Sequence, residues 1–353
     1  MVEIQGIERA TRLHNQAYVF DGCIPGMGFF KEPDVELRAI TEGGVAGANV
    51  TVAQQNHDFR RALDSMIQLE KVQERFSNKM RICRSVAELK AAREEERLGV
   101  VFHFQDAKPM EDKLDNVETF YRLGLRVLQL TYNTQGWLGT GCAERHDAGL
   151  STLGLQVIEE CNRLGILVDV SHCGWTSAWD AIRHSKQPVS ITHTGAYALC
   201  QATGRNKPDD MLKAVADTGG VVGAIWFSAL LRREAGSHRV APTSIRDVLG
   251  HLQHMVDVVG PDHVAIGSDL SNYHARTLEM PADSSLKWYR PLRPDVFGDG
   301  PTDRYDPFPD GLDSHSKMRN LTAGLVDLGY SDEDITKILG GNWLRLFESV
   351  WRV

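Results

Sequence analysis

Short apolar runs alternate along the chain with longer segments in which apolar residues recur every three or four positions. Runs rich in Val, Ile and Leu predict strands buried on both faces, and the longer segments predict amphipathic helices. Eight strands are predicted, at residues 17–22, 46–53, 99–105, 127–132, 166–172, 188–193, 220–227 and 263–269. This alternation indicates an α/β protein with a (β/α)8 TIM barrel. A doubly wound open sheet is the alternative, but no Gly-rich phosphate loop follows the first strand.

Two regions depart from the simple alternation. Charged helical segments, residues 58–76 and 85–99, lie between the second and third predicted strands. After the last strand, residues 271–315 are rich in proline and aromatic side chains, which predicts a lid over the barrel or a subunit contact. An ordered surface loop is the alternative for that segment. We expect residues 1–353 to form a single barrel domain with these additions.

Composition limits the classes of partner. The chain has 353 residues, of which 42% are hydrophobic and 24% are charged, as in ordinary soluble globular proteins. The formal net charge of −8 argues against a broad basic face and therefore against nucleic acid as the main partner. No run approaches the roughly 18 apolar residues of a membrane span, and the N-terminal segment is polar rather than signal-like. We expect a small-molecule substrate and no membrane partner.

The cysteines favour a reducing compartment. Six are present, with no Cys-x-x-Cys pair and no regular spacing. In a chain of this length without a signal-like start, they are typical of free thiols. We therefore expect a cytoplasmic protein.

Side chains suited to catalysis or ligand binding recur where the predicted strands end. In a barrel of this class, the carboxyl ends of the strands carry the functional groups. His172 and His193 end consecutive strands, so they are expected about 5 Å apart, within reach of a shared ion. Imidazoles with carboxylates nearby are common ligands of divalent metals. The other residues at these ends are Asp21, Cys23, Gln105, Asp106, Tyr132, Asn133, Trp226, Phe227 and Asp269.

Two charged residues near these ends have open alternatives. Asp269 follows the apolar run "VAIGS" and is a candidate metal ligand, a candidate acid or base, or a cap of the following loop. Arg205 lies in "TGRNKPDD", in the loop after the His193 strand. Its guanidinium is placed either to clamp a substrate carboxylate or to pair with Asp209 or Asp210.

Two further residues are secondary candidates. His103 lies two residues before Gln105 and shares its side of the strand, so it is a further candidate imidazole ligand. Trp226 either lines a pocket wall, where it would contact substrate, or belongs to the apolar core.

Several longer segments carry a resemblance to a known family. The stretches "GLSTLGLQVIEECNRLGILVDVSH" and "PVSITHTGAYALCQATGRNKPDDMLKAV" contain the two strand-end histidines, and "VAIGSDL" contains Asp269. Together with "FYRLGLRVLQLTYNTQG" and "NLTAGLVDLGYSDEDITKILGGNWLRLFESVW", they resemble the renal (membrane) dipeptidase family, peptidase family M19, a branch of the amidohydrolase-like barrels. The resemblance runs over most of the chain and is most specific in its middle and C-terminal thirds. It implies a binuclear zinc enzyme that cleaves dipeptides with a free C-terminal carboxylate.

The resemblance also implies roles for individual residues. It matches His172 and His193 to two ligands of one metal, and Asp269 to the aspartate near the other metal. Arg205 matches the residue that clamps the substrate carboxylate.

This chain departs from the family pattern at several of its ligand positions. The His-x-Asp pair at the end of the family's first strand falls on Cys23 and Pro25, in "DGCIPG". The glutamate that bridges the two metals falls on Gln105, in "HFQDA". The histidine that helps to polarise the scissile carbonyl falls on Tyr132, in "LTYN". These replacements resemble a divergent subgroup of the family rather than random decay.

The departures change the charge that is available to hold metal. Two divalent ions about 3.5 Å apart repel each other by about 19 kcal/mol at an effective dielectric constant of about 20. A neutral amide and a proline in place of two carboxylates cannot offset that repulsion. We expect zero or one Zn²⁺ per chain and not a binuclear pair, with His172 and His193 as ligands and Gln105 or water completing the shell. Cys23 and His103 are the further candidates.

Three functional hypotheses remain, and we favour the first. It is an amidohydrolase with one metal, in which Asp269 transfers the proton, Tyr132 donates to the oxyanion, Gln105 supports the centre and Arg205 orients a small amide or dipeptide-like substrate. The second is a metal-independent acid/base enzyme, a lyase, isomerase or hydrolase, acting on a small metabolite. The third is a non-catalytic protein with an inherited pocket. The resemblance and the Pro-rich segment predict a homodimer.

Overall fold

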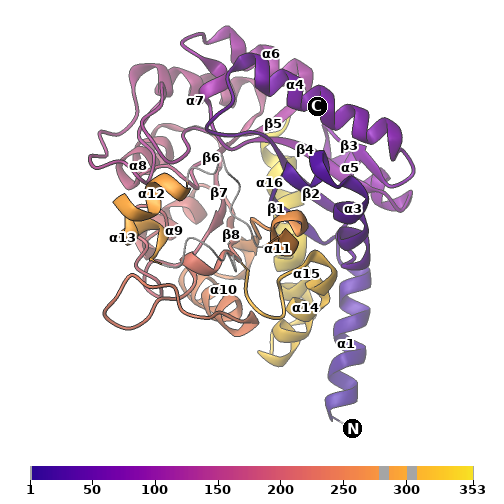
Figure 1. Ribbon diagram of the computed structural model, residues 1–353. Coiled ribbons are helices and arrows are strands. Elements are labelled where there is room, and N and C mark those ends of the chain that lie inside the picture. The colour runs from indigo at the N-terminus through magenta and orange to yellow at the C-terminus, as the bar shows by residue number, and fades with distance from the viewer. Residues whose placement is uncertain (1, 278–285, 300–307, 353) are drawn as a thin grey trace.

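The computed structural model describes residues 2–277, 286–299 and 308–352. Its strands belong to one sheet, in which neighbours follow the order β1-β2-β4-β5-β6-β7-β8-β9 and every pair is parallel. The strands gather at the centre and the helices surround them (Figure 1). The fold is therefore the nearly closed (β/α)8 barrel that the sequence predicts.

The strands are β1 (Phe20–Pro25), β2 (Gly47–Ala53), β3 (Met80–Ile82), β4 (Leu98–Phe104), β5 (Leu125–Gln129), β6 (Leu167–Asp169), β7 (Val189–Thr194), β8 (Val222–Ala224) and β9 (Val264–Ile266). The helices before the Pro-rich segment are α1 (Val2–Gln16), α2 (Met27–Lys31), α3 (Pro33–Glu42), α4 (Phe59–Arg75), α5 (Val86–Glu94), α6 (Asp115–Leu123), α7 (Thr152–Leu164), α8 (Trp175–His184), α9 (Asp209–Asp217) and α10 (Ile245–Val259).

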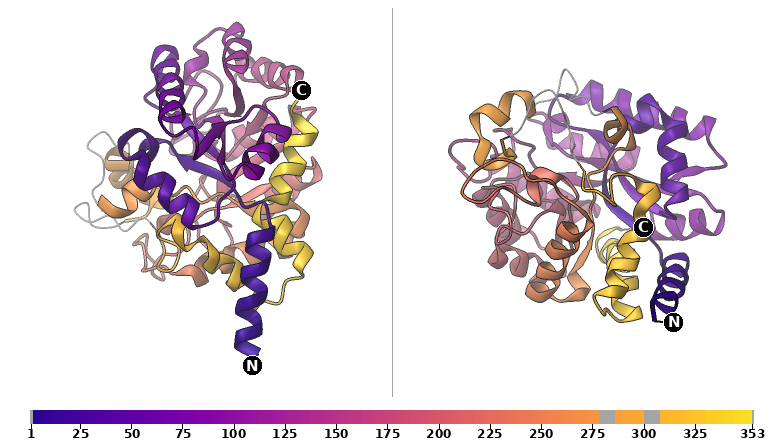
Figure 2. Two further views of the ribbon diagram at one scale, coloured as in Figure 1. Left: turned by 90° about the vertical axis from the view of Figure 1, so that its right-hand side faces the viewer. Right: turned by 60° about the horizontal axis from the view of Figure 1, so that its bottom comes forward.

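The remaining helices are α11 (Asn272–Thr277), α12 (Leu286–Leu292), α13 (Pro294–Phe297), α14 (Met318–Asp327), α15 (Asp332–Thr336) and α16 (Asn342–Val350). Short 3₁₀ turns occur at η1 (Lys108–Met110), η2 (Ser228–Leu230), η3 (Pro261–His263) and η4 (His315–Lys317), and a π-helical turn, η5 (Lys337–Gly341), precedes α16. The helix α1 projects from the barrel beside α14 (Figure 2). The ring of His14 on α1 forms a hydrogen bond with the hydroxyl of Thr322 on α14. Within the described residues, no helix has both the length and the apolar character that a membrane span requires.

Two details near the second strand differ from the prediction. A three-residue strand, β3, lies between the charged helices α4 and α5 and pairs with β4 outside the barrel path. The segment predicted as one helix over residues 85–99 ends at Glu94, and Glu96, at φ 55°, turns the chain into β4. A strand this short has no detectable period, which explains why the pattern missed it.

The barrel interior is polar at the level of the last strand residues. His103 on β4 contacts Asp169 on β6, with Nε2 and Oδ2 3.3 Å apart, although β5 lies between those strands in the sheet. The contact therefore crosses the inside of the barrel. Both side chains are fully buried, so this ionisable pair forms a floor beneath the carboxyl ends of the strands.

Side chains help to close the barrel between its first and last strands. The backbone N–H of Asp269, just past β9, donates to the carbonyl of Cys23 on β1 at 2.9 Å. The Asp21 carboxylate accepts from the backbone N–H of Ser268 at 2.9 Å and from the Ser268 hydroxyl. Oδ2, which accepts from the Ser268 hydroxyl, also lies 3.1 Å from Nε2 of His315. We call this joint, Asp21 with Ser268 and His315, the closing seam.

The closing seam also holds both ends of the predicted lid or interface segment. Nδ1 of His315 lies 2.8 Å from the Asn272 amide, which donates to the buried Glu36 carboxylate at 2.9 Å. Asn272 begins α11 and His315 begins η4, so the start and the end of the Pro-rich segment are fastened to the barrel and to α3. Part of that segment, residues 278–285 and 300–307, lies outside the described residues.

Removing the Asp21 carboxylate is expected to weaken the whole barrel. Asp21→Ala leaves buried donors on Ser268 and His315 without their acceptor, which costs about 3 kcal/mol of the free energy of unfolding. A urea titration followed by tryptophan fluorescence should show a lower midpoint for this variant. The exposed Asp217→Ala on α9 is the control, with a change below about 0.5 kcal/mol. Equal midpoints for the two variants would contradict this account of the seam.

Candidate active site

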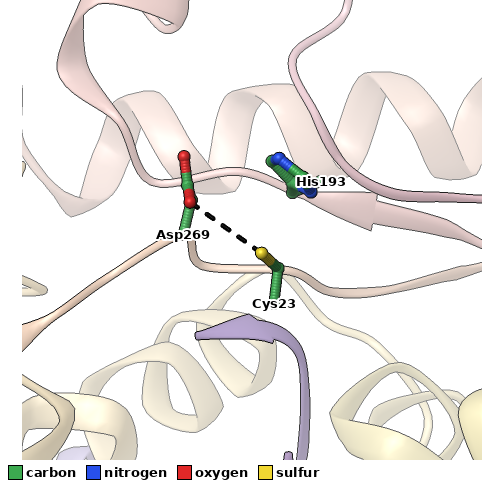
Figure 3. Close-up of side chains that lie close together, drawn as sticks. All are labelled: Cys23, His193 and Asp269. Carbon is green, nitrogen blue, oxygen red and sulfur yellow. Dashed lines mark hydrogen bonds between the residues drawn. The ribbon is translucent and has the colours of Figure 1, made fainter. Parts of the chain in front are cut away.

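Three potential ligand side chains meet at the carboxyl end of the barrel. Cys23 lies in β1, His193 in β7, and Asp269 three residues after β9 (Figure 3). One ligand atom of each lies within 4.8 Å of the other two. Sγ of Cys23 is 3.8 Å from Oδ1 of Asp269. The structure thus brings together residues from opposite ends of the sequence.

Gln105 connects two members of this group. It follows β4 directly, and its Nε2 donates to Sγ of Cys23 at 3.0 Å. The same Nε2 lies 3.3 Å from Nε2 of His193. The carboxamide therefore sits between the thiol and the imidazole, in the interior of the site.

His172 lies beside His193, as the two strand ends predict. Their Nε2 atoms are 3.0 Å apart. Nδ1 of His172 lies 2.8 Å from Oδ1 of Asn133, and the Tyr132 ring stacks on the imidazole with centroids 4.1 Å apart and planes 17° apart. The His172 ring is therefore held on two sides.

The hydrogen bonds define the tautomers of both rings. The Thr192 hydroxyl donates to Oδ2 of Asp169 at 2.6 Å, so its oxygen accepts from Nδ1–H of His193 at 2.8 Å. Nδ1–H of His172 donates to the side-chain amide oxygen of Asn133, Oδ1, at 2.8 Å. A neutral ring with its proton on Nδ1 bears a lone pair on Nε2. The two lone pairs therefore point into the same space.

Arg205 supplies a buried cation beside these rings. Its Nη2 lies 3.2 Å from Nε2 of His172, and its Nη1 donates to the carbonyl of His193 at 2.9 Å. Asp209 lies against His254 instead, at 2.8 Å, and no ion pair of Arg205 with Asp209 or Asp210 occurs within the described residues. Of the two placements open from the sequence, the structure has the guanidinium at the site.

A second buried cation, Lys207, was not predicted from the sequence. Its Nζ donates to the carbonyls of Cys173, at 2.6 Å, and Gly204, at 3.1 Å. Burial lowers its pKa to about 8. Lys207 holds the loop that carries Arg205 against the strand end that carries His172, so it is a positioning residue.

Burial governs the protonation of the site. Burial, and then the nearby Arg205 charge, hold the pKa of His172 and of His193 well below its ordinary value, so both rings are neutral. Burial raises the pKa of Asp269 to about 7, with a contribution from Asp21, while Arg205 opposes the rise. Burial and neighbouring carboxylates raise the pKa of the Cys23 thiol well above its ordinary value.

Comparison with known proteins identifies the family. The model of the membrane dipeptidase family, peptidase family M19, matches residues 7–287 and 298–353. The chain belongs to the membrane dipeptidase family.

Solved structures agree with this assignment. An amidohydrolase from Pseudomonas aeruginosa superposes with a TM-score of 0.83 at 30% identity, covering 97% of this chain and 99% of that one. The probable dipeptidase PvdM from the same organism has a TM-score of 0.80 at 22% identity, with 98% of each chain covered. Among curated sequences, an uncharacterized protein of the pqqA 5′ region in Klebsiella pneumoniae is 29% identical over 282 residues, 78% of this chain and 91% of that one. The family and these neighbours support a hydrolase of the dipeptidase type.

Two of the departures from the dipeptidase pattern are adjacent in space. Cys23 and Gln105, at the positions matched to a histidine ligand and to the bridging glutamate, are in direct contact. Pro25 ends β1 and has no side-chain ligand atom. Tyr132 lies half-buried against His172, and burial raises the pKa of its hydroxyl, so it remains a donor. Of the replaced residues, Cys23 and Gln105 thus form one pair, and Tyr132 lies against the retained His172.

The donor set fits a single divalent ion. The imidazole of His193, one thiol and one carboxylate converge, and the second imidazole, His172, lies beside His193. The ring N–H groups of both histidines are fixed by acceptors, as is usual for histidine ligands. Asp269 supplies the one carboxylate of the ligand group found within the described residues.

Two candidates lie away from the ligand atoms. His103 contacts Asp169 in the barrel interior rather than the Cys23 group. Trp226 is fully buried and belongs to the apolar core, and its predicted contact with substrate stays a prediction. The sequence pattern did not identify Asp169 and Thr192, which orient the ring of His193. A polar residue inside each of the apolar runs "LVDVSH" and "VSITH" was the available signal.

The two site histidines are expected to stay neutral at mildly acidic pH. A histidine of ordinary pKa, about 6.5, is mostly protonated at pH 6. Because burial and Arg205 depress both pKa values, ring ¹⁵N NMR of the metal-free protein at pH 6 should show His172 and His193 with a proton on Nδ1 only. His172→Asn and His193→Asn assign the signals. An imidazolium signal from either ring would contradict the predicted tautomers.

Proposed function

We propose that this protein hydrolyses a small amide or dipeptide-like substrate with a free carboxylate, using at most one metal ion. The observation that carries the proposal is the convergence of a titratable carboxyl, Asp269, a buried guanidinium, Arg205, and two neutral imidazoles at the carboxyl end of the barrel. Membership of the membrane dipeptidase family supports the reaction class.

Asp269 is suited to move the proton. Its pKa of about 7 lies near working pH, where one group both accepts and donates a proton efficiently. It is partly exposed, so water reaches it. Its backbone φ of 55° is uncommon for a residue with a side chain, and such strain is typical of functional positions. In the proposed reaction, Asp269 takes a proton from the attacking water and returns it to the leaving amine.

Arg205 and Tyr132 bind the two ends of the substrate. Arg205 spends only part of its five N–H donors on His193 and His172, which leaves donors for a substrate carboxylate. The Tyr132 hydroxyl stays protonated and supplies a hydrogen bond to the oxyanion that develops at the amide carbon. Gln105 supports the centre by holding Cys23 and His193.

A zinc ion would be held here by Cys23, His193 and Asp269, and would supply polarisation of the amide carbonyl and a more acidic water. Two ions are not proposed, because Gln105 is neutral where a bridging carboxylate would have to offset their repulsion.

One observation favours a metal-independent acid/base enzyme as the second candidate. Gln105 already donates to Cys23, and Arg205 lies in hydrogen-bond distance of His172, so the site is internally paired without an ion. The metal content of protein purified without chelator separates the two. One zinc per chain, lost together with turnover, supports the hydrolase, and a metal-free active enzyme supports the alternative.

The cytoplasmic location, the homodimer and a role of the Pro-rich segment as lid or interface stay predictions.

Replacing Asp269 should remove turnover. Asp269→Asn keeps the size of the side chain but cannot carry the proton, so kcat should fall by about 10²-fold or more. The measurement is amino-acid release from a panel of dipeptides and N-acyl amino acids. Asp217→Asn, on the exposed surface of α9, should leave kcat unchanged. Full activity in Asp269→Asn would end this assignment.

Replacing Arg205 should act on substrate binding. Arg205→Lys keeps the charge but loses the planar pair of donors, so KM for a dipeptide should rise about tenfold. The matching dipeptide amide, which has no carboxylate, should already bind poorly and change little. An equal loss for both substrates would show that Arg205 supports the fold rather than the substrate.

A further inference from the structure

We propose that Cys23, His193 and Asp269 form a thiolate-containing site for one soft or borderline divalent ion, and that His172 is not one of its ligands. The inference deepens the proposed hydrolase, since it concerns the same end of the barrel, but its test needs no substrate. It also differs from the expectation that His172 and His193 together hold the ion.

The geometry selects these three residues. Their ligand atoms all lie within 4.8 Å of one another, which is the spacing of atoms that surround one ion (Figure 3). Two atoms that each lie about 2.0–2.3 Å from a zinc ion are at most about 4.6 Å apart, which is close to the separation limit of this group. Cys23 and His193 are fully buried, so bulk water does not compete for these positions.

The two histidines have different surroundings. The Nε2 lone pair of His193 points toward Gln105 and the Cys23 group. That of His172 lies 3.2 Å from Nη2 of Arg205, a cation that already satisfies it. An ion bound to His172 would have to share that lone pair with the guanidinium and approach its positive charge. His193 is therefore the ligand and His172 the anchor of Arg205.

Gln105 holds Cys23, His193 and Asp269 together before an ion binds. Its amide nitrogen donates to Sγ of Cys23 at 3.0 Å and also hydrogen-bonds Asp269. Together with the contact to His193, this amide touches all three proposed ligands. An ion entering the group takes the place of this amide nitrogen. The site is thus pre-assembled by a neutral side chain rather than by charge.

The sulfur sets the class of ion. Thiolate ligands select zinc, cadmium or cobalt over magnesium, calcium or manganese, which prefer oxygen. Binding requires the thiolate, so the Cys23 proton passes to solvent as the ion enters. With Cys23, His193 and one carboxylate, the set has the mixed sulfur, nitrogen and oxygen character of a mononuclear zinc site.

Cobalt spectroscopy tests this on the full-length protein. After dialysis against chelator, titration with Co²⁺ should produce a thiolate-to-cobalt charge-transfer band in the near ultraviolet that saturates at one equivalent. Cd²⁺ should displace the band and Mg²⁺ should not. Cys23→Ser should abolish the band, and Cys142→Ala, which removes another buried thiol at this end of the barrel, should retain it. Circular dichroism confirms that each variant is folded.

The histidine variants test the second half of the proposal. His193→Ala should weaken Co²⁺ binding by about 10-fold or more, whereas His172→Ala should change it by less than about threefold. Retention of the band in Cys23→Ser, equal losses in both histidine variants, saturation at two equivalents, or no binding at all would overturn the inference. A one-equivalent band in a protein that cleaves no amide would leave the metal site standing and remove the proposed hydrolase instead.

Discussion

The ionised Asp169 carboxylate is the constraint on which the site rests. It accepts hydrogen bonds from the backbone and hydroxyl groups of both Ser171 and Thr192 and contacts the ring of His103. Burial alone would raise its pKa, but His103 and these hydrogen bonds hold the pKa well below its ordinary range. Because Ser171 and Thr192 directly precede His172 and His193, one buried charge fixes the backbone on which both imidazoles stand. It also sets the tautomer of one of them through the Thr192 hydroxyl.

At the carboxyl ends of the strands, above Asp169, the replacements remove carboxylate and imidazole groups that the family pattern has at its ligand positions. Cys23 and Tyr132 stand at positions matched to histidines. Gln105 and Pro25 stand at positions matched to carboxylates. Two buried basic groups, Arg205 and Lys207, lie beside the ligand group, whose carboxyl within the described residues is Asp269, with the ionised Asp169 beneath it. Arg205 and Lys207 favour an anionic group at this end of the barrel, which agrees with the proposed carboxylate-bearing substrate.

The sequence was most informative where a one-dimensional pattern determines position. Parallel strands end at the same edge of the barrel, so His172, His193 and Asp269 could be placed near one another from the alternation alone. Partners across the barrel could not be predicted. Asp21 and His315 are 294 positions apart, and no local period connects them. The placement of Arg205 was open for the same reason, since two aspartates nearby in sequence offered an equally good partner.

The closing seam has a consequence for how the site adapts. Cys23 and Asp269 stand on opposite sides of the joint between the first and last strands, which one backbone hydrogen bond and the Asp21 side chain help to hold together. A small widening there would separate thiol from carboxyl while leaving the ladders on either side intact. The distance between the Cys23 thiol and the Asp269 carboxyl is therefore set by this joint rather than by the strand ladder on either side.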